Sequence, residues 1–187
     1  MNKIGITGSL ASGKSTVGRM LSGRKHPLFD ADKTVRKIYK RNFFKNKVYK
    51  KFKLQNKKNI KNKLKKIISS NKKSLKDLER IIHPLVRKEL KGFIKKNQKK
   101  KLLIFEIPLL IESKLMKNYD KIIFVNSKKI IRMKRYLKRG KNKNIFNLLD
   151  KRQIQPAKKI KFCDYVINNN GSLKTLQKNV KIIKSKI

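Results

Sequence analysis

The stretch that decides the fold is GSLASGKS, residues 8–15, near the start of a 187-residue chain. Its two glycines, Lys14 and Ser15 have the spacing Gly-x4-Gly-Lys-Ser of a phosphate-binding loop. The glycines allow a tight turn in which successive backbone N–H groups face one anion. An apolar run at residues 3–7 predicts a strand before the loop, and residues 14–21 predict a helix after it. This context favours a nucleotide site over a chance glycine turn.

The residues that close the loop have the chemistry needed to hold a nucleoside triphosphate. Lys14 is expected to reach the β- and γ-phosphates, and the hydroxyl of Ser15 to ligate Mg²⁺. Thr16 adds a hydroxyl nearby. The loop alone indicates that phosphate is held. It does not name the group that receives it, because GTPases, motors and small-molecule kinases share the motif.

Two carboxylates that end the second predicted strand, residues 28–29, are candidates for the transfer chemistry. Asp30 and Asp32 stand there, and the carboxyl ends of parallel strands line the ligand crevice of an open sheet. A carboxylate in that place could accept a proton from an attacking hydroxyl. Asp32 could equally cap a helix predicted at residues 33–39. The spacing does not decide between these two roles.

The remaining pattern alternates strands with helices, which predicts an α/β fold with a parallel sheet and helices on both faces. Pro84 is expected to bend or break a helix predicted at residues 75–90, and Ser172 to cap the last helix. The lysine-rich segment 41–74 is interpreted as helical with mobile connections. The other predicted strands are 102–107, 121–125 and 165–167, and the other predicted helices are 128–138 and one that ends near Gln153.

Positive charge dominates the composition, since 55 Lys and Arg face 10 Asp and Glu and the formal net charge is +45. Such a charge suits a nucleic-acid surface, but 45 of these residues are Lys and only 10 are Arg, the better bidentate ligand. With 23 Ile and three Ala, the pattern indicates drift in an AT-rich genome. We therefore expect no specific nucleic-acid partner. The apolar runs are too short to span a bilayer, and a single cysteine fits a reducing compartment, so we expect a cytoplasmic protein without membrane contact.

Six segments, in the same order and at similar intervals, resemble the dephospho-CoA kinase family. Each segment after the loop is short, but their common order makes the resemblance specific, and it covers nearly the whole chain. The segments are IGITGSLASGKSTV (4–17), FDADKTVRKIY (29–39), LERIIHPLV (78–86), IPLLIES (107–113), RYLKR (135–139) and QIQPAKKIKFCDYVINNNG (153–171).

This resemblance implies a P-loop kinase similar to the nucleoside monophosphate kinases, with a five-stranded parallel sheet flanked by helices in one domain, residues 1–187. A helical CoA-binding part would span about residues 33–95 and a lid about residues 136–155. The implied reaction transfers the γ-phosphate of ATP, with Mg²⁺, to the ribose 3′-hydroxyl of dephospho-CoA. We expect ATP and dephospho-CoA as partners of a monomer or small homo-oligomer.

The resemblance also assigns roles to residues outside the loop motif. Asp32 is implied as the general base for the attacking hydroxyl and as a contact of the acceptor. Arg139, with Arg135, falls where the lid approaches the nucleotide, and with Lys14 it would stabilise charge on the transferring group. The implied ATP-binding residues are Gly8, Ala11, Ser12, Gly13, Lys14, Ser15, Thr16 and Arg135.

Several residues and the function itself keep a second interpretation. His83 could contact the acceptor or bond to the backbone beside Pro84, and Glu106 could lie near Mg²⁺ or pair with lysines. Cys163 stands where the family usually has Ala, which favours a small buried side chain over a reactive thiol. The alternatives to the implied function are another small-molecule or nucleotide kinase and a basic nucleic-acid-binding protein with a vestigial loop.

Overall fold

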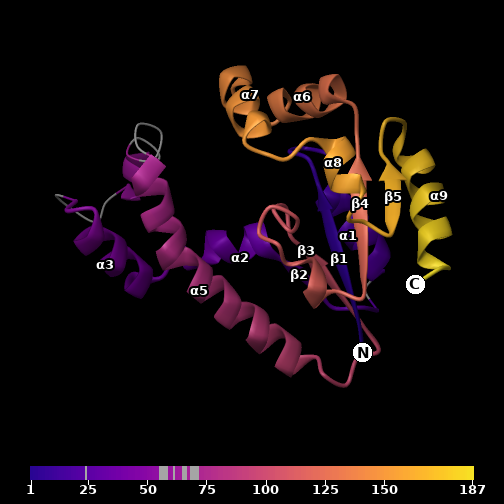
Figure 1. Ribbon diagram of the computed structural model, residues 1–187, viewed down its shortest axis with the longest axis horizontal. Helices are drawn as coiled ribbons and strands as arrows, with labels where there is room; N and C mark the ends of the chain where they lie inside the picture. Colours follow the sequence, from indigo (N-terminus) through magenta and orange to yellow (C-terminus); the bar gives the residue numbers. More distant parts are fainter. Residues whose placement is uncertain (24, 55–58, 61, 65–66, 68–71) are drawn as a thin grey trace. The chain divides into compact units, whose positions relative to one another are not determined.

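The computed structural model describes residues 1–187 except 24, 55–58, 61, 65–66 and 68–71. Five parallel strands make one sheet in the order β2-β3-β1-β4-β5 (Figure 1), which confirms the predicted parallel sheet. The strands are β1 (Asn2–Gly8), β2 (Leu28–Asp30), β3 (Leu102–Glu106), β4 (Lys121–Asn126) and β5 (Tyr165–Asn168). The α-helices of the described residues are α1 (Lys14–Ser22), α2 (Ala31–Ile38), α3 (Asn42–Lys51), α5 (Lys72–Lys96), α6 (Lys129–Leu137), α7 (Lys143–Lys151), α8 (Pro156–Ile160) and α9 (Leu173–Lys184).

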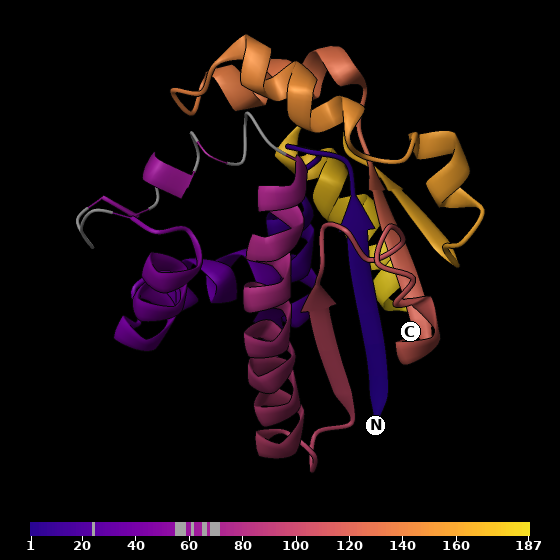
Figure 2. The ribbon, with the colours of Figure 1, turned by 60° about the vertical axis from the view of Figure 1, so that its left-hand side comes forward.

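The phosphate-binding motif lies at the point where the strand order of the sheet reverses. From β1 the chain passes to β2 and β3 on one side and then to β4 and β5 on the other. In open parallel sheets ligands bind at such a switch point, beyond the carboxyl ends of the strands. The loop that follows β1 lies there, and Figure 2 shows α6 and α7 beyond the same ends of the strands.

The chain forms two compact units. The first consists of Met1–Asp30 with Asn97–Ile187 and contains the whole sheet together with α1, α6, α7, α8 and α9. The second, Ala31–Lys96, contains α2, α3 and α5. Each unit has its own cluster of buried apolar side chains, as a separately packed core requires.

Both faces of the sheet in the first unit are covered, which explains the unbroken apolar runs of its central strands. Successive side chains of a strand point to opposite faces. Ile123 accordingly packs with the residues of α1 and α9, whereas Ile122 packs with Leu110 and Ile111 on the other face. The final helix α9 is capped as predicted, because the Ser172 hydroxyl accepts a hydrogen bond from the Thr175 N–H.

Of the two outcomes predicted at Pro84, a bend or a break of the helix, the second unit excludes the break. Helix α5 runs from Lys72 to Lys96 without ending at that residue. Pro84 removes one helical hydrogen bond, but apolar residues on both sides of it pack in the same cluster with α2 and α3. That continuous packing favours one helix over two. The members from α5 are Leu78, Ile81, Ile82, Leu85 and Val86.

The predicted helical character of residues 41–74 is confirmed where the structure describes them in α3. Its apolar side chains Phe44 and Val48 are four residues apart and fully buried. The parts of this prediction at residues 55–58, 61, 65–66 and 68–71 lie outside the described residues. Helix α8 was not predicted as a separate element, because five residues are too few for a helical period to be recognised.

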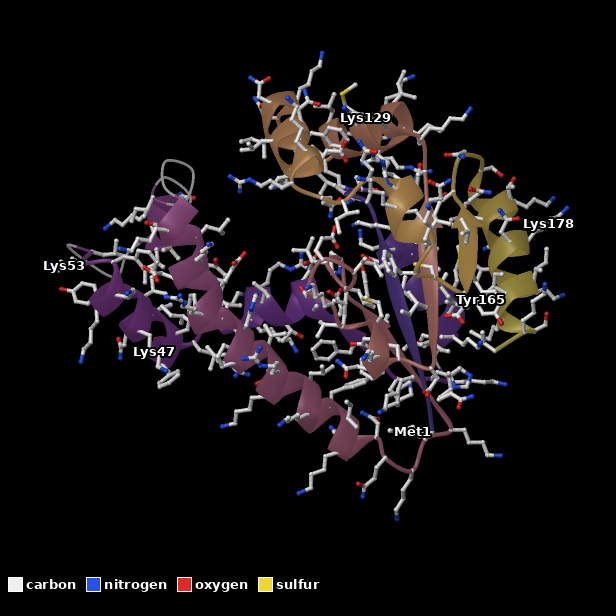
Figure 3. All side chains as sticks on the ribbon, viewed as in Figure 1. Met1, Lys47, Lys53, Lys129, Tyr165 and Lys178 are labelled. Carbon is white, nitrogen blue, oxygen red and sulfur yellow. The ribbon has the colours of Figure 1, made fainter. Side chains whose placement is uncertain are left out.

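The lysine excess lies mostly on the surface of each unit. Figure 3 shows the side chains of Lys47, Lys129 and Lys178 extending away from the ribbon, and all three residues are exposed. Exposed lysines of this kind lie on solvated faces, as compositional drift predicts. In the described part of the chain, no helix is long and apolar enough to cross a membrane.

Candidate active site

The loop after β1 has the backbone that its glycines permit. Gly8 has a φ of 151° and Gly13 a φ of 100°, conformations that residues with a Cβ rarely adopt. The side chain of Lys14 folds back over the loop, and its Nζ donates to the carbonyl oxygens of Gly8 at 3.1 Å and Ser9 at 2.9 Å. Lys14 is buried. The structure therefore holds an ammonium group against the loop in which the sequence predicts a phosphate.

Ser15 and Glu106 bring the loop and the end of β3 together. The Ser15 hydroxyl donates to Glu106 Oε1 at 2.7 Å, and Glu106 is only 3% exposed. Asp30, the last residue of β2, is paired in register with Glu106 across the two strands. Two carboxylates thus end adjacent strands, and the serine hydroxyl bonds to one of them, Glu106. This contact supports the interpretation that Glu106 lies beside the predicted Mg²⁺ ligand Ser15.

Arg135 and Asn169 hold the outside of the loop at Ser12. The Asn169 Nδ2 donates to the Ser12 carbonyl at 2.8 Å, and the Arg135 Nη1 lies 3.5 Å from the same oxygen. Arg135 also donates to Asn169 Oδ1 at 3.2 Å. A Cβ at Gly13 would overlap the Asn169 amide, so the close approach needs glycine there.

The paired arginines lie close enough to affect each other. Partial burial lowers the pKa of Arg135, and the charge of Arg139 lowers that pKa further. Arg139 follows the end of α6 and is exposed. Arg135 lies beside the phosphate-binding loop, and an anion bound there would relieve its repulsion with Arg139.

The two acceptor-side candidates belong to the second unit. Asp32 lies in the first turn of α2, which begins at Ala31, so it is not at the N-cap position that one interpretation gave it. A carboxylate in a first helical turn is still favoured by the helix dipole. His83 lies on an exposed face of α5. The structure thus brings Lys14, Ser15 and Arg135 together in the first unit, and Asp32 and His83 belong to the second.

A shallow hollow runs along the face of α5 that carries His83. Its lining residues recur at helical spacing, so they form one stripe of the helix. Cationic side chains predominate in this stripe, and Glu79 is its single carboxylate. The lining residues are Lys76, Glu79, Arg80, His83, Pro84 and Arg87.

Sequence reasoning missed three residues that hold the loop from a distance: Arg132, Gln153 and Asn169. Gln153 accepts a hydrogen bond from the Leu10 N–H across 143 residues, and no local pattern reports a contact of that kind. The sequence could have indicated Asn169, because this residue follows the carboxyl end of the last strand, where ligand crevices lie.

Glu112 and Lys159 form a structural pair rather than part of the candidate site. The Lys159 Nζ lies 2.5 Å from Glu112 Oε1, and the Lys159 side chain is fully buried. Glu112 Oε1 also accepts from the Ile154 N–H at 3.2 Å. Cys163 is half-buried, and burial raises the pKa of its thiol to about 11. A thiol that keeps its proton is a poor nucleophile, in agreement with the structural interpretation of Cys163.

The oxygen atoms beside the loop suit a hard cation. Ser15 offers a hydroxyl, and Glu106 a buried carboxylate 2.7 Å from it. Mg²⁺ prefers oxygen ligands, and in kinases one or two from the protein are enough because phosphates and water supply the others. The described residues contain no group of three or more His, Cys, Asp or Glu that could hold a metal by themselves.

Comparisons with known proteins agree on one family. A model of the family described as dephospho-CoA kinase matches residues 2–175. The dephospho-CoA kinase of Fusobacterium nucleatum is 37% identical over 182 residues, covering 95% of this chain and 94% of that protein. That of Aquifex aeolicus is 35% identical over 186 residues, covering 97% and 95%. The solved structure of the dephospho-CoA kinase from Campylobacter jejuni superposes with a TM-score of 0.72 at 28% identity, covering 99% and 96% of the two chains.

Proposed function

The chain belongs to the dephospho-CoA kinase family, and we propose which of its residues carry out the ATP-dependent phosphorylation of dephospho-CoA. In this final step of CoA biosynthesis, the terminal phosphoryl group of ATP passes to the ribose 3′-hydroxyl, giving CoA and ADP. The observation that carries the assignment of residues is the loop after β1, where Lys14 and the Ser15–Glu106 pair lie together at the carboxyl ends of the strands.

ATP binds to the loop through backbone N–H groups and through Lys14. The loop conformation at Gly8 and Gly13 directs successive N–H groups toward one anion. Lys14 exchanges its hydrogen bonds to loop carbonyls for the β- and γ-phosphates, a favourable exchange because a charged acceptor makes the stronger bond. The remaining ATP-binding residues are Ala11, Ser12, Ser15, Thr16 and Arg135.

Mg²⁺ accompanies ATP, and Ser15 with Glu106 would hold it. The Ser15 hydroxyl would supply an oxygen ligand, and the Glu106 carboxylate would supply negative charge that attracts the cation. When bound, the ion neutralises charge on the phosphate oxygens. The buried carboxylate also fixes the rotamer of Ser15, so the hydroxyl points to one place before the nucleotide arrives.

Asp32 accepts the proton of the attacking hydroxyl as its oxygen bonds to phosphorus and the bond to ADP breaks. Support comes from its position two residues after Asp30, at the end of β2, in an exposed place that a substrate reaches. Arg139 stabilises negative charge on the transferring group, together with Lys14. Its exposure after α6 suits a residue that meets the nucleotide.

The acceptor binds to the helical part of the chain. We assign this role to about residues 33–95, with His83 as one contact, and the lid to about residues 136–155. The cationic stripe of α5 around His83 supports this assignment, because dephospho-CoA carries a pyrophosphate group. The chain works as a monomer or small homo-oligomer without a specific nucleic-acid partner.

A direct assay tests the function. The chain is incubated with ATP, Mg²⁺ and dephospho-CoA, and the products CoA and ADP are quantified. We expect both products in equal amounts. Absence of CoA at any enzyme concentration, or faster transfer to a nucleoside monophosphate from a panel of acceptors, would contradict the proposal. Tight nucleic-acid binding at high salt without ATP turnover would favour the rival binding function.

A further inference from the structure

One residue of the phosphate-binding loop has a strained backbone. Ala11 has a φ of 59°, the left-handed region, although it carries a Cβ. This conformation costs an L-residue about 1–2 kcal/mol relative to the right-handed one. Strain of that size persists only when the surrounding structure holds it in place. The contacts of the two neighbouring residues, Leu10 and Ser12, therefore decide how the loop keeps its shape.

Leu10 is held on both sides by side chains from distant parts of the chain. Its N–H donates to Gln153 Oε1 at 2.8 Å, and its carbonyl accepts from the Arg132 Nη1 at 3.2 Å. The Leu10 carbonyl is held by Arg132, and the Ser12 N–H donates to the Ser9 carbonyl at 3.2 Å, so the peptide groups on both sides of Ala11 have fixed directions. The Leu10 N–H points to Gln153 and is not among the groups available to phosphate.

Arg132 is itself locked in one position. It is 3% exposed, its Nε donates to the Ser127 carbonyl at 3.0 Å, and its Nη1 contacts Asp150 Oδ1 at 2.6 Å. The guanidinium also lies over the ring of Phe146, 5.6 Å from its centre. Asp150 and Phe146 both belong to α7. A buried, paired and stacked guanidinium has little freedom, so it can fix the carbonyl that it binds.

We propose that Arg132 is a positioning residue that presets the phosphate-binding loop, acting with Gln153 through the backbone of Leu10. Asp150 holds the guanidinium, so the segment that carries α6 and α7 fixes the loop before any nucleotide is present. Preorganisation of this kind strengthens binding because the loop loses less conformational freedom when ATP binds. The proposal rests on the proposed function only in taking ATP as the ligand of the loop.

The test measures ATP affinity in the whole protein, without acceptor. Arg132→Met removes the donor to Leu10 and keeps an apolar stem, and Gln153→Leu removes the acceptor from the other side of Leu10. Lys134→Met is the matched control, an exposed residue of the same helix. Calorimetric titration with ATP and Mg²⁺ is done at a temperature where circular dichroism shows each variant fully folded. The KM for dephospho-CoA is measured in parallel.

We expect ATP affinity to fall about tenfold in Arg132→Met and in Gln153→Leu, the size of one lost buried hydrogen bond. The control should stay within about twofold, and the KM for dephospho-CoA should not change. Because both variants act through Leu10, the double variant should lose less than the product of the two single effects.

A folded Arg132→Met protein that binds ATP as tightly as the wild type would reduce Arg132 to a purely structural role and overturn the proposal. If Arg132→Met does not fold, Gln153→Leu provides the test. Unchanged ATP affinity in Gln153→Leu would then overturn the proposal. Failure of the proposed function looks different. A wild-type chain that makes no CoA but binds ATP would contradict the reaction and leave the comparison of ATP affinities intact.

Discussion

The Ser15 hydroxyl donates a 2.7 Å hydrogen bond to Glu106 Oε1, although the two residues are 91 positions apart. Ser15 lies in the first turn of α1, and Glu106 is the last residue of β3. The bond therefore joins the phosphate-binding loop to the neighbouring strand at the switch point of the sheet. It also places a buried carboxylate where a cation bound to Ser15 would meet it.

Glu106→Gln should raise the Mg²⁺ concentration needed for half-maximal rate by about tenfold to a hundredfold, the usual effect of losing an outer ligand contact. The amide keeps an oxygen for Ser15 but loses the charge that attracts the cation. The measurement is the initial rate against Mg²⁺ at fixed ATP. Glu89→Gln is the control, since Glu89 pairs with Arg41 on the surface of the second unit. An unchanged Mg²⁺ dependence in Glu106→Gln would remove Glu106 from the metal site.

Asp32→Asn should lower kcat by about two to four orders of magnitude, because only the proton acceptor is lost. ATP affinity should stay within about twofold, since the loop is unchanged. Asp30→Asn separates the two carboxylates. We expect its kcat to fall less, because Asp30 is in strand register with Glu106 and supports the site rather than the proton transfer. Near-normal turnover of Asp32→Asn would refute Asp32 as the base.

The sequence predicted the elements that are recognised from residues close together in the chain. The loop at Gly8–Ser15, the apolar strands and the Ser172 cap all depend on neighbours in the chain. The break that was one of two predictions for Pro84 does not occur, because apolar residues on both sides of Pro84 pack in one cluster. The cluster around Leu78 and Val86 contributes to the stability of one continuous helix.

The candidate site was predictable where a motif or a family resemblance marks its residues, as for Lys14 and Ser15. Its supporting contacts were not. Arg132, Gln153 and Asn169 reach the loop over more than 100 residues, and ordinary polar side chains leave no periodic pattern. Only the folded arrangement reveals which of many lysines, arginines and amides meet the loop.

Gly13→Ala should destabilise the fold and weaken ATP binding. A Cβ at a φ of 100° is strained by about 1–2 kcal/mol, and it would also overlap the Asn169 amide. Adding Asn169→Ala should relieve the overlap but not the backbone strain, so recovery should be partial. Urea unfolding gives the free energy of unfolding of the single and the double variant, and titration with ATP gives their affinity. Gly92→Ala is the control, because a Cβ there meets nothing in α5 and should stabilise the helix by up to about 1 kcal/mol. Full recovery in the double variant would show that φ imposes no cost.

Cys163 should react slowly with alkylating reagents at pH 8. Burial raises the pKa of its thiol to about 11 from the ordinary 9.0, so the reactive thiolate is scarce, and the rate should rise about tenfold for each pH unit. The unfolded chain releases this proton at lower pH than the folded one, so stability should fall as pH rises from 9 toward 11. Cys163→Ala should lose less stability across that window. Equal slopes in the two proteins, or fast alkylation of the folded chain, would contradict a buried protonated thiol.

Lys159→Met should destabilise the protein by about 3–5 kcal/mol, because it leaves the Glu112 carboxylate largely buried without its cation. The measurement is the free energy of unfolding in urea. Glu112→Gln combined with Lys159→Met should recover most of the loss, since a neutral amide oxygen still accepts from the Ile154 N–H. Lys158→Met, the exposed neighbour in α8, should change stability by less than about 0.5 kcal/mol. If the double variant is no more stable than Lys159→Met, the loss comes from packing around Lys159 rather than from an unpaired charge.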